Sequence, residues 1–125
     1  MGSLSYLLDS TVLIDVLNRV PGSLEFLQIH VDQSAVSPVT RAEVLAGVKD
    51  EDAEDIGAWL SEFDYLPLDL KSVDLAASLR RQHRWKLPDA FQAAMAMHYK
   101  LKLVTRNTKD FPPEKFDFVT VPYKI

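Results

Sequence analysis

The stretch Ser5-Tyr6-Leu7-Leu8-Asp9-Ser10-Thr11-Val12-Leu13-Ile14-Asp15 sets a pattern that the rest of the chain repeats. Its first four residues form a short apolar-rich run, which predicts a buried β-strand. Asp9 closes that strand. Apolar residues then recur at helical spacing, at Val12, Leu13, Val16, Leu17 and Val20. Pro21-Gly22 ends the predicted helix. A strand that leads directly into a helix is the unit of an α/β fold.

The same alternation of strand and helix continues to the C-terminus. Further strands are predicted at Ala35–Ser37, Tyr65–Leu68, Leu101–Thr105 and Phe118–Val121. Further helices are predicted at Leu24–Val31, Thr40–Val48 and Ile56–Phe63, around Leu75–Leu79, and from Pro88 to His98. Thr40 and Glu43 have the spacing of a capping box at a helix start. We therefore expect one three-layer α/β/α domain over residues 1–125, with a central parallel sheet of four to five strands.

The composition is that of an ordinary globular protein. The 125 residues are 47% hydrophobic and 26% charged, which suits one domain with a real core. There is no cysteine, so disulfides and thiolate zinc sites are excluded. No apolar run approaches the roughly 20 residues of a membrane span, and the N-terminus lacks the pattern of a signal peptide. We expect a cytoplasmic protein without a membrane partner.

The charge balance is acidic, with 14 Lys and Arg against 18 Asp and Glu and a net charge of −4. A protein that held nucleic acid mainly by neutralising phosphates would be basic. The balance therefore argues against a passive nucleic-acid binder. It is compatible with an enzyme whose acidic pocket binds cations.

Four acidic residues, Asp9, Glu43, Asp89 and Asp110, occupy equivalent places, each just after a predicted strand or in the first turn of a predicted helix. The carboxyl ends of parallel strands meet at one edge of a sheet, so these side chains are expected to gather there. Two carboxylates about 4 Å apart repel by about 4 kcal/mol at an effective dielectric constant near 20. A divalent cation relieves that repulsion, and an oxygen-only ligand set favours Mg²⁺ or Mn²⁺ over zinc.

Each of the four also has a structural explanation. Asp9 can cap the first helix or form an Asx turn, and Glu43 can complete the capping box with Thr40. Asp89 suits the positive end of a helix dipole, and Asp110 suits a turn. The structural explanation holds for any one of them alone. Four in equivalent places favour a shared site.

The chain resembles the PIN-domain family, and more closely its VapC-type toxins from bacterial and archaeal toxin–antitoxin pairs. The resemblance covers almost the whole length. It is carried by four strings in the family's order and spacing: Leu8-Asp9-Ser10-Thr11-Val12-Leu13-Ile14-Asp15, Val39-Thr40-Arg41-Ala42-Glu43-Val44-Leu45-Ala46-Gly47, Leu87-Pro88-Asp89-Ala90, and Val104-Thr105-Arg106-Asn107-Thr108-Lys109-Asp110-Phe111.

The resemblance implies a metal site. Asp9 and Asp89 match the family's metal-binding aspartates, and Glu43 matches a glutamate that binds the metal or positions its waters. Relatives place a further carboxylate at the position of either Asn107 or Asp110, and here only Asp110 is charged. Asn107 is then left to supply an amide oxygen.

Thr11, Thr105 and Asn107 are expected to support the metal site without binding the metal directly. Many relatives have Asn at the position of Thr11, whose hydroxyl is expected to orient Asp9 or a metal-bound water. Thr105 and Asn107 are expected to act in the same supporting way. Asp15 is expected to be a solvated helix residue or a peripheral contact rather than a ligand.

The resemblance also implies an activity and partners: a Mg²⁺-dependent endoribonuclease, with Mn²⁺ as a substitute, that cuts single-stranded RNA or exposed loops and leaves 5′-phosphates. Arg84, Lys86, Arg106 and Lys109 are candidate RNA contacts. A VapB-like antitoxin is expected to block the acidic pocket with a basic side chain. A homodimer is also expected, with the helix of Trp59 as a candidate face.

Three alternatives stay open from the sequence. One is a PIN-domain RNA-processing nuclease outside any toxin–antitoxin pair. Another is a PIN-like domain retained only to bind protein. The third is a receiver-type phosphorylation switch, which has a similar length and layout; against it, Asp9 has no acidic neighbour and Pro122, rather than a lysine, follows the last strand.

Overall fold

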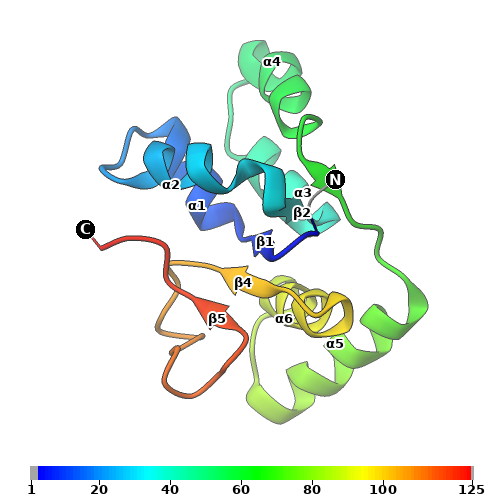
Figure 1. Cartoon of the computed structure of the whole chain (residues 1–125). Coiled ribbons are helices and arrows are strands. Elements are labelled where there is room, and N and C mark those ends of the chain that lie inside the picture. Colours follow the sequence, from blue (N-terminus) through cyan, green and yellow to red (C-terminus); the bar gives the residue numbers. More distant parts are fainter. Residues whose placement is uncertain (1–2, 125) are drawn as a thin grey trace.

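The computed structural model describes residues 3–124, so both ends of the predicted domain, residues 1–2 and 125, lie outside it. Its centre is one five-stranded sheet in the order β3-β2-β1-β4-β5, in which every neighbouring pair is parallel (Figure 1). The strands are β1 (Tyr6–Leu8), β2 (Ser34–Val36), β3 (Asp64–Tyr65), β4 (Lys102–Val104) and β5 (Val119–Thr120). The parallel α/β sheet predicted from the sequence is confirmed.

Helices cover both faces of this sheet (Figure 1). On one side lie α1 (Ser10–Leu17), α2 (Ser23–His30), α3 (Pro38–Ala46) and α4 (Asp50–Leu60), with the short 3₁₀ helix η1 (Val31–Gln33) after α2. On the other side lie α5 (Leu70–His83) and α6 (Leu87–Tyr99). This is the three-layer arrangement that the sequence predicts. In the part of the chain described, no helix is both long and apolar enough to cross a membrane.

Successive residues of β1 pack into two different hydrophobic cores, one on each face of the sheet. Leu7 packs into the cluster beneath α5 and α6, whereas Leu8 packs into the cluster beneath α1 to α4, because side chains alternate along a strand. Both leucines are wholly buried. Burial of such a side chain stabilises the fold by about 1.5–3 kcal/mol. The central strand is therefore anchored on both faces, which fixes where Asp9 emerges from its end.

The start of α3 differs from the prediction. The helix begins at Pro38, and its N-cap is Ser37, whose Oγ accepts a hydrogen bond from the backbone N–H of Thr40 at 3.0 Å. The predicted capping box of Thr40 and Glu43 is therefore wrong. Proline is well suited to the first helical position, because its fixed φ is already helical and its missing N–H would have no helical partner there. Glu43 consequently lies in the second turn of α3 rather than the first.

Other predicted bounds also differ from the structure. The helix predicted at Ile56–Phe63 runs from Asp50 to Leu60, and the strands around Tyr65, Leu103 and Val119 are shorter than their apolar runs. A turn closes α4, with the N–H of Phe63 donating to the carbonyl of Leu60 at 3.3 Å. Apolar periodicity continues past the ends of these elements because the flanking residues are buried too.

Candidate metal centre

The four acidic side chains come from four elements around the carboxyl end of the sheet. Asp9 follows β1, the central strand, and Asp110 lies in the loop after β4, its neighbour on one side. Glu43 is on α3, which follows β2, the neighbour on the other side. Asp89 is in the first turn of α6. Strand order thus brings segments that are remote along the chain to one edge of the sheet.

The pKa of Asp89 is affected by the charges of the other three carboxylates. Burial raises the pKa of its carboxyl, and the negative charges of Asp9, Asp110 and Glu43 raise it further, to about 6, against the smaller opposing effect of Lys86. No protein donor within residues 3–124 hydrogen-bonds to the Asp89 carboxylate. A half-buried carboxylate beside three others and without a donor is electrostatically uncompensated.

Asp9 is the most firmly held of the four. It is 4% exposed. The hydroxyls of Thr105 and Thr11 donate to its Oδ2 at 2.7 and 3.1 Å. The side-chain amide of Gln92 donates to its Oδ1 at 3.2 Å. Asp9 stands at the N-cap position of α1, but its side chain forms no capping bond. The capping explanation for its carboxylate is therefore wrong.

Gln92 also supports the site, although no motif in the sequence predicts this role. It is wholly buried on α6, and its Oε1 accepts a bond from the Ser37 hydroxyl at 2.6 Å. Its Nε2 donates to Thr40 Oγ1 at 2.7 Å as well as to Asp9, and Thr40 donates onward to the Leu8 carbonyl at 2.7 Å. One amide thus connects the end of β1, the start of α3 and α6. The sequence does contain a sign of this role, because Gln92 is the one polar residue in the otherwise apolar run Ala90–Met97.

Glu43 and Asp110 are less constrained. The Ser10 hydroxyl donates to Glu43 Oε1 at 2.9 Å, and Glu43 itself is exposed. The Asn107 side-chain amide donates to Asp110 Oδ2 at 3.1 Å, and its own Oδ1 accepts the Asp110 N–H at 3.3 Å. The Asn107 backbone N–H donates to Thr105 Oγ1 at 3.0 Å, so the loop is tied to the threonine that holds Asp9.

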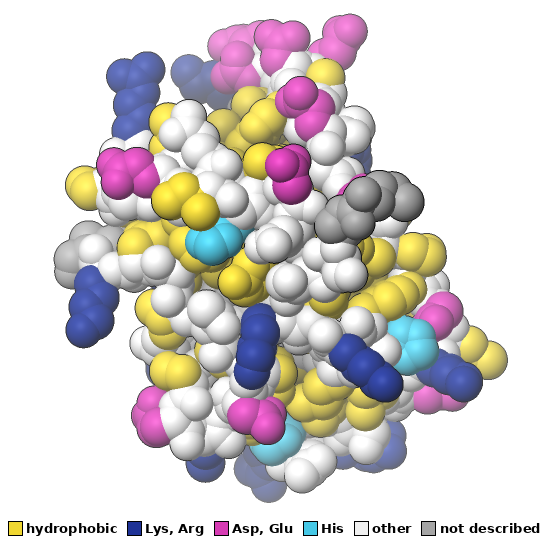
Figure 2. Space-filling model, in the orientation of Figure 1, with side chains coloured by type: hydrophobic (Ala, Val, Ile, Leu, Met, Phe, Trp, Pro, Cys, Tyr) yellow, Lys and Arg dark blue, Asp and Glu magenta, His cyan; other side chains and the backbone are white. Residues whose placement is uncertain are grey.

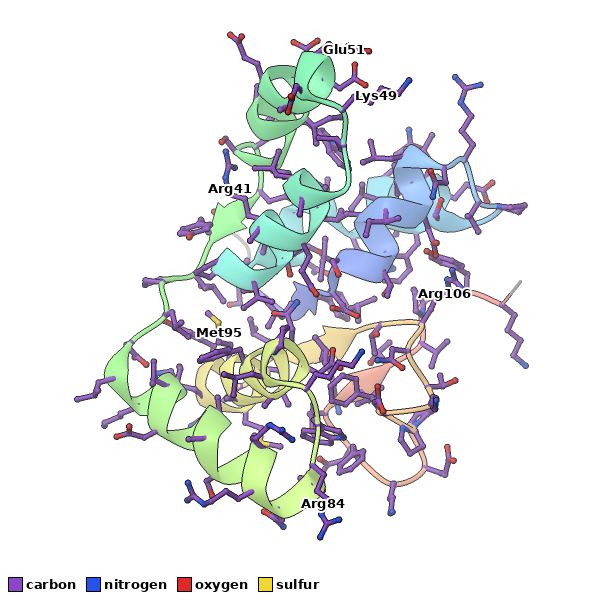
Figure 3. The ribbon with its side chains drawn as sticks, turned by 180° about the vertical axis from the view of Figure 1, so that it is seen from behind. Arg41, Lys49, Glu51, Arg84, Met95 and Arg106 are labelled. Carbon is purple, nitrogen blue, oxygen red and sulfur yellow. The ribbon has the colours of Figure 1, made fainter. Side chains whose placement is uncertain are left out.

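Asp15 differs from the expectation of a solvated helix residue, because it is buried and paired with Arg106. The Arg106 guanidinium donates to both Asp15 oxygens, through Nε and through Nη2 at 2.7 Å, and the Tyr123 hydroxyl donates to Asp15 Oδ2 at 2.7 Å. Burial alone would raise the pKa of Asp15, but hydrogen bonds from Arg106 and Tyr123 hold it below its usual value. Figure 3 shows Arg106 where the loop after β4 meets α1.

The other candidate RNA contacts are exposed, whereas the two tryptophans are buried or partly buried. Lys86 is exposed at the N-cap of α6, close enough to Asp89 to affect its pKa. Arg84 and Lys109 are exposed on the rim of one pocket. Trp85 is a core residue, and Trp59 is partly buried against Phe63 with ring centroids 5.7 Å apart.

The chemistry of these side chains fits a hard divalent cation. Carboxylate oxygens are the ligands that Mg²⁺ prefers, and no Cys or His enters the group. Across residues 3–124, no three acidic or histidine side chains stand close enough to share an ion as they are arranged. The uncompensated Asp89 and the three-donor cradle of Asp9 are nevertheless what a cation-binding edge needs. A cation would remove the mutual repulsion of the four carboxylates.

A parallel sheet with acidic side chains gathered at its carboxyl edge is the architecture of a family of nucleases. The sequence pattern of the PIN domain matches residues 6–112. The chain belongs to the PIN-domain family, whose members are nucleases. This membership excludes the receiver-type alternative.

Solved structures agree with that assignment. A chain of a toxin–antitoxin complex from Klebsiella pneumoniae is 33% identical, with a TM-score of 0.87 over 97% of this chain and 100% of that one. FitAcB from Neisseria gonorrhoeae is 22% identical, with a TM-score of 0.75 over 96% and 99%. DNA-bound VapBC from Salmonella typhimurium is 18% identical, with a TM-score of 0.74 over 87% and 91%. The last two show a shared fold. A comparison with curated proteins gave no match.

Proposed function

We propose that this chain is a Mg²⁺-dependent endoribonuclease and the toxin of a toxin–antitoxin pair. The observation that carries the proposal is the position of Asp9, Glu43, Asp89 and Asp110 around the carboxyl end of the sheet, where burial and the other three charges raise the pKa of Asp89 to about 6. A fold that keeps four repelling carboxylates together forgoes stability unless a cation joins them. Membership in a family of nucleases supports the same conclusion.

The side chains divide into ligands and supports. Asp9, Asp89 and Asp110 would hold Mg²⁺ or Mn²⁺, and Glu43 would bind it as well or orient the attacking water. When bound, the ion polarises a water and stabilises negative charge on the phosphate. Thr105, Thr11 and Gln92 fix the orientation of Asp9. Asn107 supports Asp110, to which it is hydrogen-bonded in both directions.

RNA is the proposed substrate, cut in single strands or exposed loops to leave 5′-phosphates. Lys86 stands beside Asp89 and is suited to attract the scissile phosphate toward the carboxylates. Arg84 and Lys109 offer further positive charge nearby. Arg106 is better assigned to structure than to RNA, because its guanidinium is bound by Asp15.

A VapB-like antitoxin is the proposed protein partner, and a second copy of the chain is the proposed dimer partner. The 33% identity to a chain of the Klebsiella pneumoniae complex supports the antitoxin. A basic side chain of that partner, placed among the four carboxylates, would lower their repulsion and block the substrate. Co-expression with a VapB-like protein should give a stable complex without nuclease activity. Unimpaired cleavage in such a complex would favour the RNA-processing alternative.

The nuclease proposal is tested by RNA cleavage in Mg²⁺ or Mn²⁺, in EDTA, and with the Asp9→Asn variant. Cleavage that needs the metal, and that falls at least 100-fold on loss of a metal ligand, is expected. Unchanged cleavage by the variant would show that the activity belongs to a contaminant or to another site. No cleavage of RNA by the wild-type protein with either metal would support the alternative of a PIN-like domain that only binds protein.

A further inference from the structure

Charge is distributed unevenly along this acidic chain. Residues 71–115 carry ten Lys and Arg against four Asp and Glu, a net charge of +6. Residues 1–70 carry three against thirteen, a net charge of −10, and residues 116–125 are balanced. In Figure 2 the acidic side chains gather over α4, at the top of the molecule. A polyanion would therefore meet the acidic edge of the sheet from the side of α5, α6 and the loop after β4.

A pocket of about 260 Å³ opens on that side. The connection between α5 and α6 contributes Arg84 to its lining, and the loop between β4 and β5 contributes Lys109 and Lys115. All three are exposed, and none forms an ion pair within residues 3–124. Three cations against the single acidic residue Asp110 give this concave surface a positive charge, which favours an anion.

Aromatic packing fixes the floor of this pocket. The rings of His83 and Trp85 stack with centroids 4.3 Å apart, and Phe116 packs edge-on against both. The indole is 6% exposed, and His83 covers one of its faces. The indole is therefore not available to stack on a base, and the pocket offers recognition of charge rather than of base identity.

Asp110 joins this pocket to the acidic centre. Its backbone carbonyl accepts the Trp85 indole N–H at 3.1 Å, and the residue lines the pocket. Its carboxylate is among the three that act on Asp89. A strand bound with one phosphate at the carboxylates would therefore pass the rim of Arg84, Lys109 and Lys115 with a neighbouring phosphate.

We propose that the pocket between the α5–α6 connection and the β4–β5 loop is a phosphate subsite, which binds a backbone phosphate next to the one that is cut. The proposal rests on the proposed nuclease function and deepens it, because it names which part of the substrate is held away from the reacting centre. The subsite reads charge alone, so it contributes affinity and register without sequence preference.

Binding, measured apart from cleavage, tests the subsite. A fluorescent single-stranded RNA of mixed sequence is titrated in EDTA against the full chain carrying Asp9→Asn, over a range of salt. Adding Arg84→Gln and Lys115→Gln should weaken binding about fivefold near 0.1 M salt and reduce the slope of log K against log[salt] by about 0.7, because the contact to one phosphate of the single strand is lost.

A matched control pair is Lys71→Gln and Lys100→Gln in the same background. It removes the same charge, and Lys100, like Arg84, is a helix C-cap with positive φ, 58° against 59°. Each control residue lies at the other end of the helix from the site, roughly 20 Å away by the helical rise. The control should keep the salt slope. An equal loss in both pairs, or no loss in the site pair, overturns the subsite.

Two further sets of variants test whether a loss of binding comes from the pocket itself. The charge-retaining pair Arg84→Lys and Lys115→Arg should restore binding, and failure to restore it would overturn the subsite. Lys109→Gln alone should lower the slope even if the double variant melts early. RNA cleavage by the wild-type protein is scored separately. Cleavage without the binding contrast refutes only the subsite, whereas the binding contrast without cleavage refutes only the proposed nuclease.

Discussion

Gln92 and Asp9 are 83 positions apart, yet the side-chain amide of Gln92 donates to Asp9 Oδ1 at 3.2 Å from a fully buried position. The same amide joins Ser37 and Thr40 at the start of α3. A buried polar network of this kind stabilises the fold only when every member is satisfied. The orientation of Asp9 and the packing of α3 against α6 therefore depend on one side chain.

Replacing Gln92 by Leu should lower the free energy of unfolding by about 1–3 kcal/mol, because the Ser37 and Thr40 hydroxyls lose a buried partner. It should also weaken Mg²⁺ binding, since Asp9 is no longer held at Oδ1. Chemical denaturation and metal titration measure the two effects. Gln82→Leu, at an exposed position on α5, is the control and should change neither. Equal behaviour of the two variants would refute the positioning role of Gln92.

The raised pKa of Asp89 predicts a pH dependence of stability. The folded protein binds the Asp89 proton up to about pH 6, whereas the unfolded chain releases it near its ordinary value of 3.8. The folded state therefore holds more protons between these values, and the metal-free protein loses stability as pH rises through that window. After allowance for solvent screening, the loss should be on the order of 1–2 kcal/mol.

The Asp89→Asn variant isolates this contribution. Its free energy of unfolding in EDTA should decline less between pH 4 and pH 6.5 than that of the wild type, and it should exceed the wild-type value near pH 7. Denaturant unfolding at a series of pH values measures the difference. Parallel pH profiles for the two proteins would contradict the interaction of Asp89 with its three acidic neighbours.

Much of the fold can be predicted from local sequence patterns, whereas contacts between distant segments cannot. The apolar run of β1 and the helical spacing after Asp9 predict the strand, the helix and the place of the carboxylate between them. Ser37 and Thr40 both suit an N-cap, and Pro38 favours Ser37, because proline suits the first helical position. The bond from the Thr40 hydroxyl to the Leu8 carbonyl is a tertiary contact, which spacing along the chain does not reveal.

The surroundings of the candidate site were harder to predict than its carboxylates. Acidic residues at strand ends stand out because the sheet geometry assigns them one edge. The pair of Asp15 and Arg106 spans 91 positions. From the sequence, Asp15 is predicted to be a solvated helix residue or a peripheral contact, and Arg106 a candidate RNA contact. Only the fold shows that the two are paired.

Breaking the pair of Arg106 and Asp15 should be costly. Arg106→Met leaves the Asp15 carboxylate buried with only the Tyr123 hydroxyl to compensate it, and about 2–4 kcal/mol of stability should be lost. The double variant with Asp15→Asn should lose less than the sum of the single changes, because no buried charge remains. Denaturation of the three variants measures the coupling. Additive losses would show that the two side chains act independently.

Magnesium itself should stabilise the folded protein through Asp9. A ligand that binds only the native state at 100 times its dissociation constant adds about 2.7 kcal/mol, so the wild-type Tm should rise with Mg²⁺ and return in EDTA. The Asp9→Asn variant should show little of that rise. In EDTA it should be at least as stable as the wild type. An asparagine oxygen still accepts from Gln92, its amide can donate to the hydroxyl oxygens of Thr105 and Thr11, and the repulsion of Asp89 falls. Asp74→Asn, at an exposed position on α5, is the control for loss of one negative charge and should keep the full response to Mg²⁺. A large loss of stability in metal-free Asp9→Asn, with the Mg²⁺ response intact, would make Asp9 a structural residue and remove it from the metal site.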